Sequence, residues 1–379
     1  MKTFFDPIYG CITISPLLLR FIDTPEFQRL RDLRQLSTVH YVFPSANHTR
    51  FEHSIGVCHL ARILMSNLRE KQPDLCISVR DIELTCLAGL LHDIGHGPYS
   101  HLYDHSVRDS KEPTHEERGI ICIRNMVQKY NIPINDDELD IVLDMIHPPE
   151  DKQESWKYQI IANKKYTIDV DKMDYIKRDC YHIGIQLGGD YKRIMNECLV
   201  HEYKGNYVLA WNKKVEFDLE SLLTARFRLH KQVLTHHAVK AYEYMILHIM
   251  NDMKKKGEDL CILSDALVLQ KDNWKWKNMM DNRTIYHMIR EKRVVNGQRM
   301  EPVIKNGYVI DCIEIGYTSD VFPIRLPLYD KYHTVSLDPI FDASKKCEII
   351  YRLYMLPSLR DHYVEEAYSV WDTLMLSLS

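Results

Sequence analysis

The sequence predicts a mainly α-helical protein with a smaller C-terminal lobe of mixed α+β structure. Apolar residues recur at helical spacing over most of residues 1–255, whereas short alternating runs with Asn-Gly pairs follow the lysines at 254–256. We therefore expect a large helical domain over residues 1–255 and a second, smaller domain over residues 256–379. A length of 379 residues is sufficient for two domains.

The composition is that of a globular protein, with 45% hydrophobic and 27% charged residues. The longest apolar runs fall short of the ~18 residues of a membrane span, so we expect no membrane segment. Ten scattered cysteines without a CxxC pair fit a reducing compartment, so we expect an intracellular protein, with cytoplasm and nucleus both open. The net charge of −4 argues against a surface that grips nucleic acid as a whole, so an anionic ligand requires a local basic pocket.

The stretch AGLLHDIGHGPYSH places a His-Asp pair where a helix over 78–94 ends. Ser78 and Asp81 form an S-x-x-D capping box at the start of this helix. Two glycines at its end allow a sharp turn, so His92 and Asp93 lie beside a loop that can approach a ligand closely.

Two further predicted helices have histidine or glutamate side chains in their first turns. A helix over 51–69 has His53 at its start. Thr114 and the glutamate three residues later form another capping box, which leaves His115 and Glu116 in a first helical turn. This pair can be only a helix start, or it can be functional.

One run places three polar side chains on one helix face, at i, i+4 and i+8: Asp171, Tyr175 and Asp179. Asp174, on the same helix, is either a solvated residue or part of a site. The segment 216–254 is predicted to be one long helix, with Arg226, His230 and Leu234 on one face.

The C-terminal part predicts strands followed by a helix. Asn-Gly pairs at 296–297 and 306–307 are typical of hairpin turns, and they flank Val303-Ile304. The run YVIDCIEIGY after the second pair predicts a strand, and residues 358–377 predict a final helix.

Two imidazoles and two carboxylates stand in the order H…HD…D: His53, His92, Asp93 and Asp171. This mixed nitrogen and oxygen set suits one divalent transition ion, iron, manganese or zinc. A lone histidine on a helix is more often a core or surface residue, so the inference depends on the whole set. The order resembles that of the HD-domain metal-dependent phosphohydrolases.

Longer blocks carry a closer resemblance: DPIYGCITISPLLLRFIDTPEFQRLRDLRQL, YVFPSANHTRFEHSIGV, LAGLLHDIGHGPYSH and IDVDKMDY. They are similar to the catalytic core of the sterile-alpha-motif and HD-domain dNTP triphosphohydrolases, and weaker similarity continues to about residue 360. The sterile-alpha-motif domain itself is not in this sequence. The resemblance implies an HD-type helical core that cleaves a dNTP to deoxynucleoside and inorganic triphosphate, with Mg²⁺ on the nucleotide phosphates.

The resemblance also implies residue roles. It makes His53, His92, Asp93 and Asp171 the metal ligands, places His96 beside the α-phosphorus, and makes an acid/base relay of His115, Glu116 and Asp104. Triphosphate-contacting positions match Arg50, His101, Lys172, Tyr175 and Arg226, with His230 on the same helix face. Gln35 and Asp179 match residues that bind the sugar 3′-hydroxyl.

The sugar gate departs from the family pattern. Leu36 of the gate is retained, but Leu234 stands where the family has the tyrosine that excludes ribose. Selectivity for deoxyribose is therefore open, and an HD hydrolase of ribonucleotides or phosphodiesters is the alternative. A non-catalytic nucleotide sensor or a single-stranded nucleic-acid binding protein is a further alternative, with nucleic acid a secondary partner.

The family is activated by guanine nucleotides bound between subunits of a tetramer. Asp23, Gln28 and Arg31 match its guanine-reading residues. Other positions around the activator pair match Lys2, Val42, Phe43, Arg193 and Lys214, whereas Phe5 and Asn212 differ from it. We therefore expect a homo-oligomer, dimer or tetramer, with GTP or dGTP as activator and with the C-terminal lobe in an oligomerisation or regulatory role.

Overall fold

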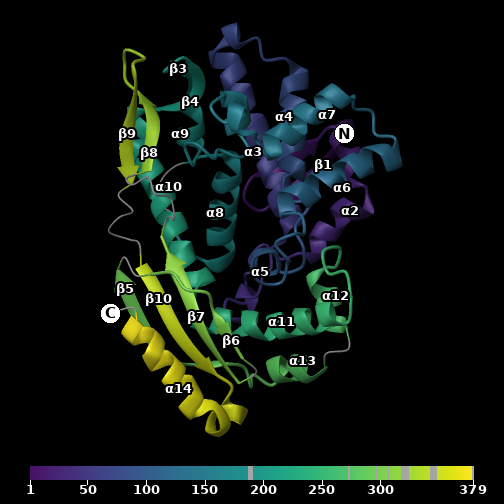
Figure 1. The fold of residues 1–379 in the computed structure, drawn as a ribbon. Coiled ribbons are helices and arrows are strands. Elements are labelled where there is room, and N and C mark those ends of the chain that lie inside the picture. Colours follow the sequence, from purple (N-terminus) through teal and green to yellow (C-terminus); the bar gives the residue numbers. More distant parts are fainter. Residues whose placement is uncertain are drawn as a thin grey trace.

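The computed structural model describes residues 1–186, 191–271, 274–295, 298–305, 307–316, 324–341 and 348–377. It confirms the predicted fold class: a mainly helical core is joined to a smaller C-terminal lobe of strands and helices (Figure 1). The helices are α1 (Pro16–Ile22), α2 (Pro25–Gln28), α3 (Arg50–Lys71), α4 (Val79–Leu91), α5 (His101–Ser106), α6 (His115–Tyr130), α7 (Asp136–Ile146), α8 (Val170–Ile183), α9 (Tyr191–Asn196), α10 (Glu216–Leu229), α11 (His237–Lys255), α12 (Asp265–Gln270), α13 (Trp274–Asp281) and α14 (Arg360–Ser377). The strands are β1 (Lys2–Asp6), β2 (Gly10–Ile14), β3 (Cys198–Tyr203), β4 (Asn206–Asn212), β5 (His287–Val295), β6 (Val303–Ile304), β7 (Tyr308–Ile315), β8 (Ile324–Tyr329), β9 (Val335–Phe341) and β10 (Glu348–Met355).

The centre of the helical core is formed by α3, α4 and α8, and their close packing depends on two glycines. A Cβ on Gly89 of α4 would lie 3.2 Å from a methyl carbon of Val57 in α3. A Cβ on Gly56 of α3 would collide with the carboxylate of Asp174 in α8. The absence of side chains at these two positions therefore lets the three helices approach closely.

The capping boxes predicted from sequence are both present. The Ser78 hydroxyl accepts from the backbone N–H of Asp81, whose carboxylate accepts from the Ser78 N–H, and α4 begins there. Thr114 and Glu117 do the same at the start of α6. Each box satisfies backbone donors that the first helical turn leaves unpaired.

The expectation that nearly everything up to residue 255 is helical is wrong at two places. β1 and β2 form an antiparallel hairpin, with Lys2 opposite Ile14, and β3 and β4 form another. β4 then pairs in parallel with β8 of the C-terminal part, which gives a sheet of order β3-β4-β8-β9. Strands from both sides of residue 256 thus share one sheet, and the domain boundary at that residue remains a prediction.

The single long helix expected over 216–254 is interrupted. α10 ends at Leu229, a π-helical turn covers His230–Leu234, and α11 begins at His237. The Thr235 hydroxyl donates to the His230 carbonyl at 2.9 Å, and the Thr235 N–H donates to the same oxygen at 3.0 Å. These two local bonds replace the regular helical ladder and separate the two helices.

The C-terminal strands form an antiparallel sheet of order β5-β10-β7-β6, and α14 packs along one face of it (Figure 1). β6 pairs with β7 as expected of a hairpin, although Asn306 of its turn lies outside the described residues. The hairpin expected around Asn296-Gly297 is wrong, because β5 and β6 lie at opposite edges of the sheet; the pair itself lies outside the described residues. The final helix predicted over 358–377 is confirmed as α14.

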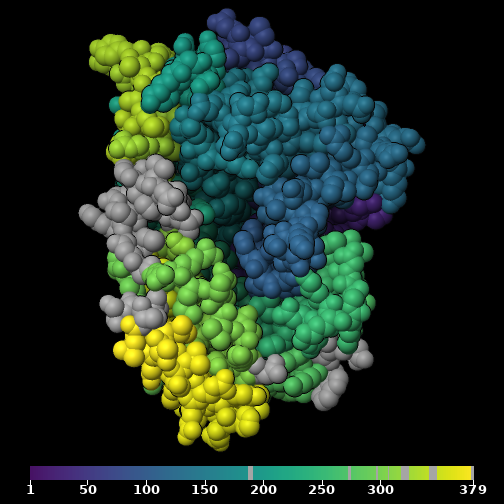
Figure 2. Space-filling view, in the orientation of Figure 1, coloured from purple at the N-terminus to yellow at the C-terminus, as the bar shows by residue number. Residues whose placement is uncertain are grey.

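Within the described part of the chain, no helix combines the length and the apolar character needed to cross a membrane. Figure 2 shows the surface hollowed at the middle of one face, between the blue surface around α5 and the green surface of the C-terminal strands. Teal surface, the colour of the chain from α8 to α10, lines the bottom of the hollow.

Candidate metal centre and neighbouring groups

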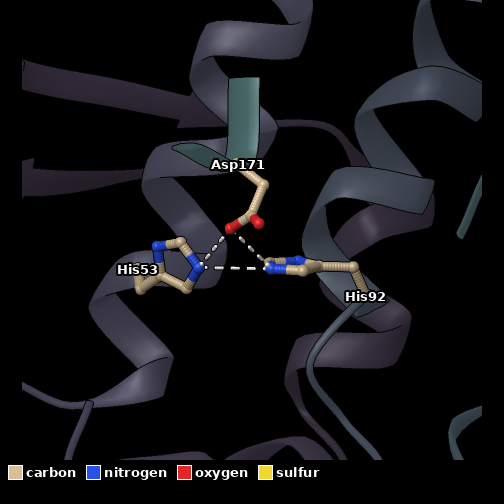
Figure 3. A group of neighbouring side chains, drawn as sticks. All are labelled: His53, His92 and Asp171. Carbon is tan, nitrogen blue, oxygen red and sulfur yellow. Dashed lines mark hydrogen bonds and ion pairs between the residues drawn. The ribbon is translucent and has the colours of Figure 1, made fainter. Parts of the chain in front are cut away.

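Three helices bring together the ligands predicted from sequence. His53 lies in the first turn of α3, His92 directly follows α4, and Asp171 lies in the first turn of α8, so the three side chains converge (Figure 3). The Oδ1 atom of Asp171 lies 3.0 Å from His53 Nε2 and 3.4 Å from His92 Nε2, and the two Nε2 atoms are 3.2 Å apart. Asp93 lies beside them, 3.4 Å from His92 Nε2 and 3.5 Å from His53 Nε2. We call His53, His92, Asp93 and Asp171 the four-ligand cluster.

The other ring nitrogen of each histidine has an acceptor of its own. His53 Nδ1 lies 2.8 Å from the Asp174 carboxylate, and His92 Nδ1 lies 2.8 Å from the Gly89 carbonyl oxygen. Both Nδ1 atoms therefore donate, so that in the neutral form of each imidazole the lone pair lies on Nε2. Two lone pairs and two carboxylates that face one another repel unless a cation or protons lie between them.

The pKa shifts within the four-ligand cluster show that it favours a bound proton or cation. Burial alone would lower the pKa of His53, but the carboxylates of Asp171 and Asp174 outweigh it and raise the pKa to about 10 in the metal-free protein. Burial would raise the pKa of Asp171, but the two histidines hold it below its usual range. A divalent cation can replace the proton on His53 as the positive charge of the cluster.

The donor set fits a transition ion. Its paired imidazole nitrogens and carboxylate oxygens are the ligands of zinc, iron and manganese sites, and the partners of the Nδ1 atoms fix both rings in the ligating tautomer. Asp174 is fully buried and also pairs with Arg178 at 2.9 Å, so the solvated reading of Asp174 is wrong. Arg178 in turn pairs with Asp6 of the N-terminal hairpin at 2.8 Å.

A second group of side chains adjoins the first. His96 and His115 stack with ring centroids 4.1 Å apart, and the Nδ1 atom of each lies 3.5 Å from Asp104 Oδ2. Glu116 lies 3.3 Å from His115 Nδ1, and His96 Nε2 lies 3.3 Å from Asp93. We call His96, Asp104, His115 and Glu116 the relay cluster. His96 thus lies between the two clusters.

The relay cluster is less completely hydrogen-bonded than the four-ligand cluster. Within the described ranges, His96 Nδ1 and Asp104 Oδ2 are buried without a hydrogen-bond partner. Burial, together with the neighbouring His96, lowers the pKa of His115 to about 4, although Glu116 opposes the shift. His115 is therefore neutral at pH 7, and its imidazole can accept a proton.

Arg118 holds Asp104 in place and was missed from sequence. Its Nη2 lies 2.7 Å from Asp104 Oδ1, and its Nε donates to the Gly95 carbonyl at 3.0 Å. The signal for it was present, because Arg118 lies three residues after His115 on the same helix.

The residues expected to contact phosphates come from several elements. Arg50 forms an ion pair with Asp93 and donates to the Ser100 hydroxyl at 2.7 Å. Lys172 pairs with Asp169 at 2.8 Å, and Arg226 Nε donates to the Tyr175 hydroxyl at 3.1 Å. His101 is exposed at the start of α5, with its ring edge-on to that of His96 at 5.3 Å.

The residues expected at the sugar come from three separate segments of the chain. Asp179 of α8 is buried and contacts His48, whereas Gln35 lies in a turn shortly after the 3-10 helix Arg29–Asp32. Leu36 is buried in the core. His230 and Leu234 lie at the two ends of the π-helical turn, and both are half-buried.

The residues expected at the activator sites form local groups. Lys2 lies 4.0 Å from Asp23, and Arg31 donates to the Gln28 side chain at 2.8 Å. Arg193 donates to the Lys214 carbonyl at 2.8 Å. Val42 and Phe43 are half-buried, and the Phe43 ring packs edge-on to His236. Whether these groups bind nucleotide stays a prediction.

Comparisons with known proteins agree with this geometry. A family model described as "HD domain" matches residues 50–179, which contain both the four-ligand cluster and the relay cluster. The chain is 39% identical over 273 residues to the deoxynucleoside triphosphate triphosphohydrolase SAMHD1 of Bos taurus, covering 65% of this chain and 46% of that protein. It is 38% identical over 292 residues to the Homo sapiens protein of that name, covering 70% and 46%.

A more distant relative extends the match. The SAMHD1 homolog of Dictyostelium discoideum is 33% identical over 309 residues, covering 77% of this chain and 59% of that protein. The chain thus spans about half the length of the vertebrate relatives it matches. Residues 50–179 of the chain therefore match the HD domain, and the chain is similar, over about two thirds of its length, to the SAMHD1 deoxynucleoside triphosphate triphosphohydrolases.

Proposed function

We propose that this protein is a metal-dependent triphosphohydrolase that cleaves a dNTP to deoxynucleoside and inorganic triphosphate. The observation that carries the proposal is the convergence of two lone-pair imidazoles and two carboxylates next to a second, incompletely hydrogen-bonded His-Asp group. The similarity to proteins named as dNTP triphosphohydrolases supports the choice of substrate.

His53, His92, Asp93 and Asp171 would hold one iron, manganese or zinc ion. A divalent ion of this kind polarises a phosphoryl oxygen and stabilises the negative charge that develops during phosphoryl transfer. A Mg²⁺ ion would accompany the nucleotide phosphates, as is usual for triphosphates.

Cationic and hydroxyl groups of the chain would bind and orient the triphosphate. Arg50, Lys172 and Arg226 carry the positive charge that a tetra-anionic tail requires, and Tyr175 is held toward Arg226 by their hydrogen bond. The carboxylates that pair with Arg50 and Lys172 in this structure keep both side chains close to the four-ligand cluster.

The relay cluster would move the protons. Cleavage at the α-phosphorus requires that the attacking water lose a proton and that the departing 5′-oxygen gain one. His115 is neutral at pH 7 and suits the role of proton acceptor, while Asp104 and Glu116 stabilise the cation that then forms. His96, whose ring stacks on that of His115, would contact the α-phosphate.

The test is the product of the reaction. Metal-loaded protein is incubated with each of the four dNTPs, with GTP present, and tripolyphosphate and deoxynucleoside are separated by ion-exchange chromatography. We expect equimolar release of both products. The absence of tripolyphosphate with all four dNTPs, or release of pyrophosphate instead, would contradict the proposal.

We further propose activation by GTP or dGTP and assembly into a dimer or tetramer. Asp23 is exposed, and Gln28 and Arg31 are joined by a hydrogen bond, so the three form a polar surface that suits a guanine edge. Sedimentation velocity with and without GTP tests this directly, and a chain that stays monomeric at saturating GTP would contradict it.

A second candidate function is hydrolysis of ribonucleotides, and Leu234 favours it. A leucine lacks the hydroxyl and ring with which the tyrosine of the family excludes ribose. Rates with dGTP and GTP as substrates separate the two functions. If the preference for dGTP is weak, Leu234→Tyr should increase it.

A further inference from the structure

His48 is a buried histidine outside the predicted site residues, and it contacts one of them. It lies in the loop before α3, is 2% exposed, and its Nε2 lies 2.7 Å from Oδ1 of Asp179 in α8. The side chain of Asp179 is itself 5% exposed. A short hydrogen bond between two buried groups fixes the geometry of both.

The direction of this bond follows from the partners. An ionised carboxylate only accepts, so the proton lies on His48 Nε2. His48 Nδ1 is then left with its lone pair, which agrees with its burial without a hydrogen-bond partner in the described part of the chain. The ring of His182 stacks on that of His48, with centroids 4.3 Å apart and planes 13° apart, which fixes the ring orientation.

His48 also contacts Gln35, the other residue expected to bind the sugar 3′-hydroxyl, through its main chain. The Gln35 N–H donates to the His48 carbonyl at 3.0 Å, and Arg34 forms a β-bridge with Thr49. The Gln35 side-chain oxygen is buried, and among the described residues it has no hydrogen-bond partner. A polar atom in this condition is available to a ligand.

We propose that His48 is a positioning residue for recognition of the sugar 3′-hydroxyl: it holds the Asp179 carboxylate through its side chain and Gln35 through its backbone. The proposal rests on the proposed function and goes beyond it, because it names the residue that sets the 3′ preference. With Oδ1 engaged by His48, the other oxygen of Asp179 is left to accept from the 3′-hydroxyl. Burial raises the pKa of Asp179, and the bond from His48 opposes that shift and favours the accepting, ionised form.

The experiment compares substrates that differ only in the 3′-hydroxyl. Values of kcat/KM for dGTP and for 2′,3′-dideoxy-GTP are measured with the wild type and with His48→Ala, with metal content checked for each. We expect the variant to lose about 10-fold or more with dGTP, the typical effect of leaving a hydrogen-bonding group of a site misplaced, and less than about 3-fold with the dideoxy substrate. The preference for the 3′-hydroxyl should therefore collapse.

Two amide variants test which ring nitrogen of His48 holds the Asp179 carboxylate. The side-chain amide of glutamine reaches the position of His Nε2, whereas that of asparagine reaches only the position of Nδ1. We expect His48→Gln to restore part of the preference and His48→Asn to restore none. His182→Phe is the matched control, because it keeps a ring stacked on His48 without touching Asp179, and its preference should equal that of the wild type.

Equal losses with both substrates in His48→Ala would overturn the proposal, since a merely structural residue affects them alike. A wild-type preference for the 3′-hydroxyl in His48→Asn would also overturn the proposal. Binding of the α-thio analogues of dGTP and dideoxy-GTP, measured by calorimetry, gives the same comparison without turnover. If the wild type proves inert as an enzyme, the proposed function fails, but a 3′-hydroxyl preference in binding that His48→Ala abolishes would still support the role of His48. No such preference in wild-type binding would overturn it.

Discussion

The four-ligand cluster and the relay cluster each combine two histidines with two carboxylates but differ in how their hydrogen bonds are satisfied. In the four-ligand cluster the Nδ1 atoms of both histidines have acceptors at 2.8 Å, and the Nε2 atoms face two carboxylates. In the relay cluster His96 Nδ1 and Asp104 Oδ2 are buried without partners in the described ranges, and their separation of 3.5 Å is too long for a good hydrogen bond.

The difference shows what each cluster requires. In the four-ligand cluster the partners of the Nδ1 atoms orient both rings while the Nε2 atoms and the carboxylates converge, which is the arrangement of a preformed cation site. The relay cluster has unsatisfied atoms that a substrate or a transferred proton would satisfy, which is the condition of a site that acts during a reaction. One cluster should therefore control metal content, and the other the rate.

The largest expected effect is that of removing a ligand. Asp171→Ala should abolish metal binding, measured as moles of metal per mole of protein by plasma mass spectrometry, and should lower kcat/KM by more than about 1000-fold. Asp140→Ala, at an exposed carboxylate of α7, is the matched control and should change neither quantity. A variant of Asp171 that keeps its metal would remove that residue from the cluster.

A variant of the relay cluster should change the rate and leave the metal in place. His115→Ala should lower kcat by about 100-fold to 10,000-fold, the range that general acid–base groups contribute, with unchanged metal content. His362→Ala, at an exposed position of α14, serves as the control. Loss of metal in His115→Ala would show that the two clusters are not separate in function.

Replacing the residue that accepts a hydrogen bond from a metal-binding histidine should have an intermediate effect on metal affinity. Asp174→Asn removes the charged partner of His53 Nδ1 and should weaken metal affinity by about 10-fold to 100-fold, as outer partners of metal-bound histidines do. Competition with a chelator of known affinity measures this, and kcat at saturating metal should be nearly normal. An unchanged metal affinity would mean that the hydrogen bond from His53 to Asp174 is not needed, and that the close packing of α3 against α8 at Gly56 is enough to orient His53.

The smallest expected effects are opposite pH dependences of stability in the metal-free protein. The pKa of His53 is raised to about 10, so its contribution is present below pH 6.5 and is lost as the pH rises toward 10. The pKa of His115 is lowered to about 4, so its contribution is present above pH 6.5 and is lost as the pH falls toward 4. Each slope is at most about 1.4 kcal/mol per pH unit for one proton.

Urea unfolding at pH 5, 7 and 9 measures these slopes. His53→Ala should flatten the alkaline side of the stability profile, and His115→Ala should flatten the acid side. If both variants flatten the same side, the assigned charge states of the two clusters are wrong.

The sequence was most informative where its pattern was local. The capping boxes at Ser78 and Thr114 and the helical spacing of α3, α4 and α8 predicted the elements that carry the ligands, because these signals depend on neighbouring residues alone. The convergence of His53, His92 and Asp171 was expected only from the family resemblance, since spacing along the chain does not give spatial contact.

The errors came from features that tertiary structure decides. β1 and β3 are short strands whose alternation is weak, and their pairing depends on a partner strand rather than on their own residues. The break after Leu234 depends on the Thr235 hydroxyl turning back to the His230 carbonyl, a bond that helical periodicity does not reveal. Asp174 was ambiguous because burial against Gly56 is a property of two helices together.

The parallel pairing of β4 with β8 has a consequence for how the chain can be divided. Trp211 and Asn212 pair with Leu328 and Tyr329, and side chains of β8 are buried in the same apolar core as α3 and α4. A fragment that ends near Lys255 would leave the edge of β4 uncovered and remove part of that core, so it should aggregate on expression. Engineering or domain exchange should therefore keep residues 206–212 and 324–329 on one polypeptide.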